Sequence, residues 1–396
     1  MTEARIIVTT SLILLFCGCQ SAQRDGMALD SSPMTHAQAD ESDDNEYLVY
    51  LGTWYTAEES PGIHVCRFNA ATGELVFLGL AAETSNSDFL AVHPNGRYIY
   101  ATSEKLGTVA AFAIDRGTGK LRFLNKINAG GADPTHIDID PMGRAVGIAN
   151  YTGGSTSVLR VNEDGRLGEM TAIVHHTGSS VNPKRQEGPH PHSVNFAPDN
   201  RFAVAVDLGA DKLLVYRYDA AVGSLAASHQ EYVTVHPGAG PRHFAFHPTG
   251  RFAYVINEFE STVTAFAYDA EGGSLEALQT ITTLPQGFAG ANLTAEVRVH
   301  PSGRFLYGSN RGHNSIAVFS IDSEKGTLTP VEIVSSRGDW PRNFRIDPTG
   351  RYLINANRDS DKVVVFGIDQ RSGRLTPTGQ VIDIDAPVCV RFVPID

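Results

Sequence analysis

Arginine, histidine and glutamate residues recur at two fixed distances from a short turn that this chain repeats. Positions four or five residues before the start of the turn hold His136, His192, Arg242, His243, Glu296 and Arg342, and positions ten or eleven after it hold Glu258, Asn310 and Arg311. A carboxylate or a neutral imidazole can take a proton from water, and a guanidinium can hold a carboxylate or a developing oxyanion. If these side chains meet, they predict acid–base chemistry on a carbonyl or acidic substrate.

The turn that sets these distances has the form Pro-x-Gly-Arg or a near copy. The residue before its proline is His93, Asp140, Ala197, His247, His300 and Asp347, with a partial copy at Val393. Successive copies are 47, 57, 50, 53, 47 and 46 residues apart. Alternating β-branched and aromatic residues between glycine turns predict four strands per repeat, as in Arg242–Phe246, Arg251–Ile256, Thr262–Asp269 and Leu275–Thr280. The period is typical of an all-β fold, a seven-bladed β-propeller with four antiparallel strands in each blade.

The two ends of the repeated region predict how the ring closes. Tyr47–Gly52 matches the second strand of a blade and Val388–Val393 matches the first, so the C-terminal strand should complete the first blade and hide its sheet edges. The start of each first strand and the end of each second strand lie on one face, so the polar residues should converge around one channel mouth. Because that rim lies outside the blade core, substitution of Arg242 or Glu258 should leave the melting temperature nearly unchanged.

Several of these residues also have a purely structural interpretation. Asparagine often only forms a turn, and it ends a predicted strand at Asn150, Asn257, Asn310 and Asn357. Rim arginines could form ion pairs between blades. His190 and His192 could bind a metal, although two histidines without a third ligand are weak evidence for a site. An insert at 178–191, which carries Lys184 and Arg185, could contact a ligand or only extend into solvent.

The net charge argues against one class of partner, and the N-terminal residues indicate export. A net charge of −12 without a Lys/Arg-rich run argues against nucleic-acid binding and gives an anionic substrate no long-range attraction. Residues 1–19 resemble a signal peptide that ends in a bacterial lipobox, with Cys19 as the lipidated residue; ordinary cleavage near Ala22 is the alternative. Residues 20–46 are acidic and lack aromatic side chains, which predicts a disordered tether. We therefore expect residues 47–396 to form the domain of a periplasmic or cell-envelope protein that reaches the membrane only through its lipid anchor.

The chain from Tyr47 to the C-terminus resembles a known family. The segments that carry the resemblance are Gln186–His192, Gly240–Pro248, Tyr254–Glu258, Glu296–Arg298 and Tyr307–Ile316. They are similar to the seven-bladed lactonases, which include the propeller-type bacterial 6-phosphogluconolactonase and the fungal carboxymuconate cyclase. The resemblance implies a rim site with a histidine, an arginine, a glutamate and a further arginine, which fall on His190 or His192, Arg242, Glu258, and Arg298 or Arg311.

These features together predict a lactone hydrolase similar to 6-phosphogluconolactonase, which opens a sugar lactone to its acid in carbohydrate metabolism. Glu258, or a neutral His192 or His243, is the expected base, and Arg242 and Arg298 are expected to hold the oxyanion and the product carboxylate. The expected substrate-binding residues are His136, His190, His243, Glu296, Asn310, Arg311 and Arg342. We expect no cofactor or metal and a monomeric protein. The export signal puts a sugar phosphate in doubt as the substrate, but not the lactone chemistry.

Three alternatives stay open. A carboxymuconate-type cyclase or lyase would use the same groups to move a proton beside a carbonyl. A metal-dependent lactonase would bind Ca²⁺ through oxygen atoms of Asn150, Asp207, Asn257 and Glu258. A ligand-binding surface propeller without catalytic activity would bind a protein or a glycan and would turn over no lactone.

Cys66 and Cys389 are the cysteines outside the signal region. An exported protein with two such cysteines suggests a disulfide. The repeat places both in the first blade with the strand Tyr47–Gly52 between them, so their backbones should lie roughly 9–10 Å apart, whereas a disulfide needs Cα atoms within about 7 Å. The sequence therefore predicts two free, buried thiols.

Overall fold

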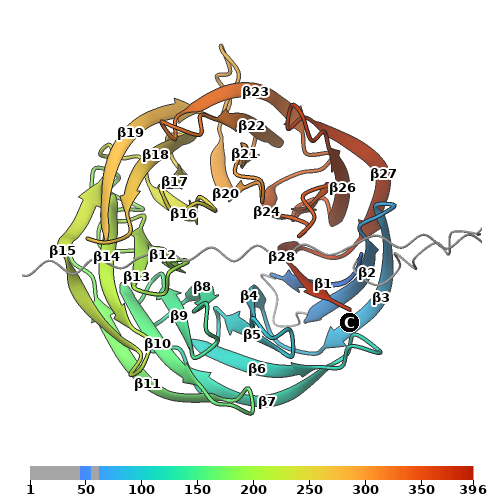
Figure 1. The fold of residues 1–396 in the computed structure, drawn as a ribbon, viewed down its shortest axis with the longest axis horizontal. Helices are drawn as coiled ribbons and strands as arrows, with labels where there is room; N and C mark the ends of the chain where they lie inside the picture. The colour runs from blue at the N-terminus through green and yellow to red at the C-terminus, as the bar shows by residue number, and fades with distance from the viewer. Residues whose placement is uncertain (1–44, 55–61, 396) are drawn as a thin grey trace, which may run out of the picture. The chain divides into compact units, whose positions relative to one another are not determined.

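The computed structural model describes residues 45–54 and 62–395, and this part of the chain consists of strands joined by turns. Seven four-stranded antiparallel sheets surround a central channel as blades (Figure 1). The predicted seven-bladed propeller is therefore confirmed. Among the described residues there is no helix long and apolar enough to cross a membrane. The expected signal peptide, Cys19 and nearly all of the expected tether lie outside the described residues.

Each blade runs from an innermost strand at the channel to an outermost strand at the perimeter (Figure 1). The innermost strands are β4 (Ser87–Val92), β8 (Pro134–Ile139), β12 (Pro191–Phe196), β16 (Pro241–Phe246), β20 (Leu293–Val299), β24 (Pro341–Ile346) and β28 (Pro387–Pro394). The second strands are β5 (Tyr98–Ser103), β9 (Ala145–Asn150), β13 (Phe202–Asp207), β17 (Phe252–Asn257), β21 (Phe305–Arg311), β25 (Tyr352–Asn357) and β1 (Glu46–Thr53).

The two outer strands of each blade complete the sheets. The third strands are β6 (Thr108–Ile114), β10 (Ser155–Val161), β14 (Lys212–Asp219), β18 (Thr262–Asp269), β22 (Ser315–Ile321), β26 (Lys362–Ile368) and β2 (Ile63–Asn69). The outermost strands are β7 (Leu121–Asn128), β11 (Leu167–His175), β15 (Ser224–Thr234), β19 (Ser274–Thr282), β23 (Leu328–Ser335), β27 (Leu375–Asp383) and β3 (Glu74–Ala82). The strands predicted for residues 242–280 differ from the observed ones by no more than two residues at either end.

The C-terminal strand closes the ring as predicted. β28 pairs with β1, with Leu48 opposite Val393, and β1 in turn pairs with β2. Cys389 lies opposite Gly52 on one side of β1, and Cys66 lies opposite Val49 on the other. Both cysteines are buried and free, as the strand order requires.

Blades are joined by apolar packing and by a repeated tyrosine contact. The hydroxyl of buried Tyr100 in β5 donates a hydrogen bond of 3.1 Å to the carbonyl of Gly165, in the turn between the outer strands of the next blade. The same contact is made by Tyr50, Tyr254 and Tyr307. Gly165 has a φ of 81°, and a Cβ there would lie 2.3 Å from the ring of Tyr98, so only glycine fits this turn.

The Pro-x-Gly-Arg turns lie together at one mouth of the channel, which we call the turn mouth. The imidazole Nε2 of His247 lies 2.8 Å from the carbonyl oxygen of Gly303 in the turn of the next blade. Exposed Arg201 donates to the carbonyl of Ala270 at 3.2 Å. His247 and Arg201 therefore tie their turns to turns of the next blade.

Candidate active site at the channel rim

Bulges at the start of the innermost strands bring extra side chains to the mouth opposite the turns, which we call the rim. Pro241 lies opposite Asn257 and His243 lies opposite Ile256, which leaves Arg242 as the extra residue of a bulge. His192 and Arg342 are the extra residues in β12 and β24. Neighbouring side chains of a regular strand point to opposite faces, and a bulge redirects one of them. The bulges therefore allow β16 to direct Arg242 toward the rim and His243 into the channel.

Glu258, directly after β17, is the centre of a group of charges at the rim. The guanidinium of Arg311 lies 2.8 Å and that of Arg242 3.1 Å from its Oε2, and Arg185 lies 3.1 Å from its Oε1. We call these four residues the Glu258 cluster. The Arg185 side chain is 42% exposed, whereas Glu258 is only 3% exposed. The insert at 178–191 therefore does contact the rim, through Arg185.

The arginines decide the charge of Glu258. Burial alone would raise the pKa of this carboxyl group, but Arg311, Arg242 and Arg185 outweigh that effect and lower the pKa to about 2. The carboxylate is therefore ionised at neutral pH and is a very weak base. Arg242 is also buried, at 2% exposure, so the rim residues are not outside the core and the expectation of an unchanged melting temperature loses its basis.

His192 lies beside the Glu258 cluster and keeps a ring nitrogen free. Its Nδ1 is buried and makes no hydrogen bond to any described residue. Burial, followed by Arg242, His243 and Arg342, lowers the pKa of His192 well below the ordinary value, so the imidazole is neutral. Its ring packs edge-on against Tyr151 at a centroid distance of 5.4 Å. A neutral imidazole with an unused nitrogen can accept a proton.

His190, in contrast, is held in place by other groups. Its Nδ1 lies 3.2 Å from the carbonyl oxygen of Tyr151, and its ring stacks on that tyrosine at 4.5 Å. Its Nε2 lies 3.1 Å from Glu187. The backbone N–H of His190 donates to Asp207, whose other carboxylate oxygen lies 2.7 Å from the buried imidazole of His176. His190 and Asp207 thus fix the strand start that presents His192.

Arg342 supplies a cation to the rim that no described residue neutralises by a hydrogen bond or an ion pair. Burial and the neighbouring Arg311 lower its pKa to about 10, so it stays charged at neutral pH. Its guanidinium carbon lies 5.9 Å from the ring centroid of Trp54. Trp340 covers the next arginine, since the guanidinium carbon of Arg311 lies 5.4 Å from its ring centroid. The rim therefore combines an excess of guanidinium charge with aromatic walls.

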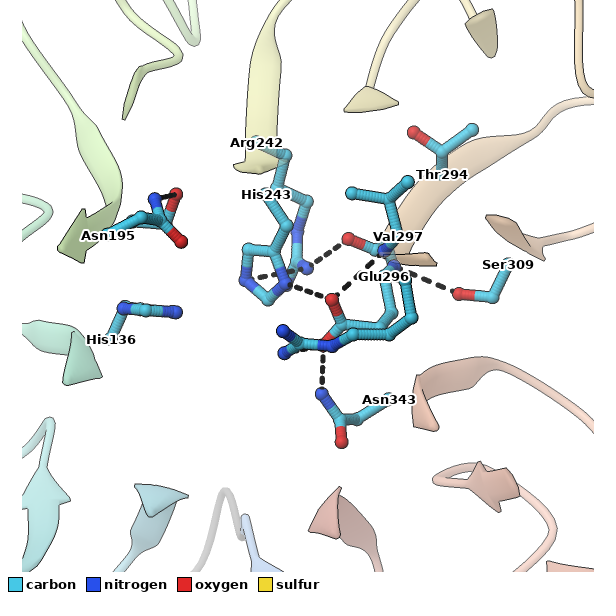
Figure 2. Close-up of polar contacts among 12 residues, drawn as sticks. His136, Asn195, Arg242, His243, Thr294, Glu296, Val297, Ser309 and Asn343 are labelled. Carbon is cyan, nitrogen blue, oxygen red and sulfur yellow. Dashed lines mark hydrogen bonds and ion pairs between the residues drawn. The ribbon is translucent and has the colours of Figure 1, made fainter. Parts of the chain in front are cut away.

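One layer deeper, three predicted binding residues, His136, His243 and Glu296, close the channel together with Asn343, the neighbour of Arg342. Glu296 is fully buried and accepts hydrogen bonds from Asn343 and, at 3.1 Å, from Arg298. The His243 ring lies 3.2 Å from the same carboxylate, and it packs edge-on against His136 at 5.3 Å (Figure 2). Burial, followed by Arg242, lowers the pKa of His243 well below its ordinary value. We call His136, His243, Glu296 and Asn343 the channel plug, and its groups are occupied with one another.

Two further predicted site residues, Arg298 and Asn310, belong to neither the Glu258 cluster nor the channel plug. Arg298 lies on the other side of the channel plug, where its guanidinium contacts Glu296 and lines a cavity at the turn mouth. Asn310 is buried, and its amide donates to the carbonyl of Thr283 at 2.9 Å and to Ser315 at 3.1 Å. Of the two further arginines that the family resemblance allowed, Arg311 is the one beside Glu258.

The residues considered for Ca²⁺ make other contacts, but the side-chain oxygens of Asn150 and Asn257 are buried and accept no hydrogen bond from a described residue. The amide of Asn257 donates to Thr262 at 2.9 Å and that of Asn150 to Ser155 at 3.2 Å, across the turn between the second and third strands. Asp207 accepts three backbone N–H groups, and Glu258 binds arginines. In the described ranges no three acidic, histidine or cysteine side chains gather as a metal site would require. The strand-end asparagines at these two positions therefore fix turns.

Tyr151 lies eleven residues after the start of its turn, as Glu258 does, but sequence reasoning gave it no role. It belongs to the rim, where its hydroxyl accepts hydrogen bonds from Arg185 at 3.0 and 3.2 Å. Four residues that the count did not reach line the cavity at the turn mouth: Asp138, Asn195, Arg345 and Arg391. Each of these four lies two residues before the start of a Pro-x-Gly-Arg turn or its partial copy, as Arg298 does. Counting two residues back, as well as four or five, would have found them.

Comparison with known proteins places this architecture in a family. A family model described as "Lactonase, 7-bladed beta-propeller" matches residues 48–392. The chain belongs to the seven-bladed lactonase family. A 6-phosphogluconolactonase of Bacillus subtilis is 37% identical over 350 residues, which cover 88% of this chain and 99% of the relative. A 6-phosphogluconolactonase of Formosa agariphila is 34% identical over 75% of this chain and 85% of its own length.

A solved structure of the lactonase family agrees with the present fold. The periplasmic gluconolactonase of Pseudomonas aeruginosa superimposes with a TM-score of 0.83 and 34% identity, and the match covers 89% of this chain and all of that protein. The resemblance to the lactonase family, which residues around the rim first indicated, is therefore confirmed.

Proposed function

We propose that this protein hydrolyses a sugar lactone at the rim of its channel, with His192 as the base and arginines around Glu258 as the anion-binding groups. The observation that carries the proposal is the buried carboxylate of Glu258 with its arginines beside a neutral histidine with a free Nδ1. Relatives named 6-phosphogluconolactonase and gluconolactonase support the same chemistry. A sugar lactone offers a carbonyl for water to attack and hydroxyl groups that polar side chains can bind.

His192 is a better candidate base than Glu258. Three arginines stabilise the Glu258 carboxylate and hold its pKa at about 2, so it gains little by accepting a proton. We propose that Glu258 instead orients Arg242 and Arg311, because each lies within 3.1 Å of its Oε2. Glu258 is thus a positioning residue. Neutral His192 can accept the proton of the attacking water, since the negative charge that forms on the substrate favours the imidazolium.

The rim arginines suit the charge that develops in the reaction. Water attacks the carbonyl carbon of the lactone. The carbonyl oxygen then becomes an oxyanion, which preorganised hydrogen-bond donors stabilise. Arg342 has no hydrogen bond or ion pair to a described residue, and the Nε of Arg311 is buried and unpaired, so both can bind the oxyanion. When the ring C–O bond breaks, His192 returns its proton to the leaving alkoxide. The carboxylic acid of the opened product then loses its proton to solvent, and its carboxylate lies among the arginines.

We propose further that the reaction needs no metal and takes place outside the cytoplasm. The first point is supported by the arginines that bind the Glu258 carboxylate and by the three backbone N–H groups that donate to Asp207. The second rests on the signal-like residues 1–19 and on the lipobox-like cysteine, Cys19. An exported enzyme would meet unphosphorylated glucono-1,5-lactone, which we propose as its substrate ahead of the 6-phosphate.

The test is turnover of a lactone panel by the purified protein, measured as acid release above the spontaneous rate. The panel holds glucono-1,5-lactone, its 6-phosphate, an aromatic lactone and carboxymuconate, each with and without a chelator. We expect hydrolysis of glucono-1,5-lactone that the chelator does not change. Loss of activity on chelation would establish a metal-dependent enzyme, cyclisation of carboxymuconate alone would establish a cyclase, and no turnover at all would favour a binding propeller.

A further inference from the structure

A cavity of about 610 Å³ lies at the turn mouth, at the other end of the channel from the Glu258 cluster. Prolines of three turns line its entrance: Pro198, Pro301 and Pro348. Its volume is within the range of small-molecule sites, about 300–1,000 Å³. Five polar residues at equivalent places of five innermost strands line its wall: Asp138, Asn195, Arg298, Arg345 and Arg391. The repeat would allow apolar residues here, since β4 and β16 have Ala91 and Ala245 at the same place.

The channel plug separates this cavity from the rim. His136 stacks on Phe89 at a centroid distance of 4.2 Å, and His243 packs edge-on against the same phenylalanine at 5.4 Å. Glu296 and Asn343 complete the layer by their hydrogen bond. These side chains are buried and contact one another across the channel, so the cavity is not an extension of the proposed active site.

The three arginines of the cavity carry more positive charge than their neighbours neutralise. Arg345 forms no hydrogen bond or ion pair with any described residue, and the Nε of Arg298 is buried and unpaired. Arg391 donates only to its neighbouring carbonyl, that of Val390, at 2.7 Å. Burial, followed by repulsion from Arg298 and Arg391, lowers the pKa of Arg345 to about 9, so it remains charged at neutral pH. A bound anion would relieve this repulsion and use the free N–H groups.

The polar groups differ between the two sides of the ring. The arginines come from three consecutive blades, those of β20, β24 and β28, whereas Asp138 and Asn195 come from β8 and β12 on the other side (Figure 1). One oxygen of Asp138 accepts the backbone N–H of Phe196 at 2.9 Å, which holds the carboxyl group in place. A carboxyl and an amide opposite three guanidinium groups match a ligand with an anionic end and a hydroxylated end.

We propose that the cavity at the turn mouth is a second binding site, which takes a small hydroxylated organic anion. Its carboxylate or phosphate group lies against Arg298, Arg345 and Arg391, and its hydroxyl groups face Asp138 and Asn195. The site is separate from the proposed lactonase reaction and does not depend on it.

The anionic half of the proposal is tested with selenate, whose selenium can be located by anomalous scattering. Crystals of the protein soaked in selenate should show selenium between Arg298, Arg345 and Arg391. In calorimetry, Arg345→Gln should weaken selenate binding by about tenfold or more, because it removes a charged donor. Arg144→Gln, an exposed arginine of a neighbouring turn, is the matched control and should bind as the wild type does. Selenium only at the rim, or equal affinity of Arg345→Gln and wild type, would overturn the proposal.

The proposed binding of hydroxyl groups by Asp138 and Asn195 is tested by comparing glycerate with propanoate. Both anions have a carboxylate, and glycerate has two additional hydroxyl groups. The wild type should bind glycerate at least several-fold more tightly. Asp138→Asn keeps an oxygen for the N–H of Phe196 but loses the carboxylate, so it should reduce this preference while it still binds selenate. Equal binding of glycerate and propanoate by the wild type would refute the assigned ligand class.

Discussion

The charge of Glu258 should contribute to folding as well as to the site, and Glu258→Gln measures that contribution. The carboxylate is 3% exposed and faces Arg242, Arg311 and Arg185. Lowering its pKa from 4.5 to about 2 corresponds to roughly 3 kcal/mol of stability when it is ionised. Breaking a buried ion pair on one side costs about 3–5 kcal/mol in comparable cases. We therefore expect Glu258→Gln to lower the free energy of unfolding at pH 7 by roughly 3 kcal/mol.

The contribution of the Glu258 carboxylate to stability should decrease as the pH falls. A group whose pKa is depressed in the folded protein stabilises it fully above the unfolded-state pKa, here 4.5, and this stabilisation is lost as the pH falls towards about 2. Denaturant unfolding of wild type and Glu258→Gln should therefore differ most at neutral pH. The two curves should approach each other between those two pKa values.

A surface pair supplies the matched control. Asp164 lies 3.3 Å from Arg166, but the two side chains are 61% and 49% exposed, so Asp164→Asn should cost less than about 1 kcal/mol. The reasoning would be refuted if Glu258→Gln were as stable as wild type at pH 7, or if its deficit were the same at every pH. Either result would mean that the arginines do not stabilise the carboxylate.

Three further predictions use other parts of the chain. Because the pKa of His192 lies well below 6.5, kcat/KM should stay constant as the pH falls from about 7.5 to about 6.5 and should decline only at lower pH. An inflection of the pH profile at or above pH 6.5 would exclude this histidine as the base. Burial raises the pKa of the Cys66 thiol to about 12 and also raises that of Cys389, so a thiol reagent should label neither cysteine in the native protein. After denaturation without reductant it should label both, and a disulfide found by mass spectrometry would contradict the strand order. Cys19→Ala should move the protein from the membrane to the soluble fraction, and an unchanged membrane fraction would rule out lipidation at this residue.

The fold could be predicted from the sequence because its information is local and repeated. Each Pro-x-Gly-Arg turn marks the same point of a blade, so the strands and the closing pair β28 and β1 follow from counting. The same regularity predicted that Cys66 and Cys389 are separated by a strand.

The depth of each side chain in the channel could not be predicted by counting. Positions four and five residues before the turn were treated as one rim, but bulges separate them, so that Arg242 reaches Glu258 while His243 reaches Glu296. Burial of the rim charges was also not evident, because it depends on neighbouring blades and on the insert that supplies Arg185. Arg298 was assigned to the rim from its resemblance to a family arginine, whereas its place in the strand directs it to the turn mouth.

The central claim, that His192 at the rim is the base of a lactonase, is tested most directly by the rate of glucono-1,5-lactone hydrolysis in two histidine variants. His229→Gln, on the exposed outer strand β15, is the matched control and should keep the wild-type kcat. His192→Gln should lower kcat by about 10²–10⁴-fold with a smaller change in KM, because it removes the proton acceptor and leaves the arginines in place. A wild-type rate in folded His192→Gln would contradict the account.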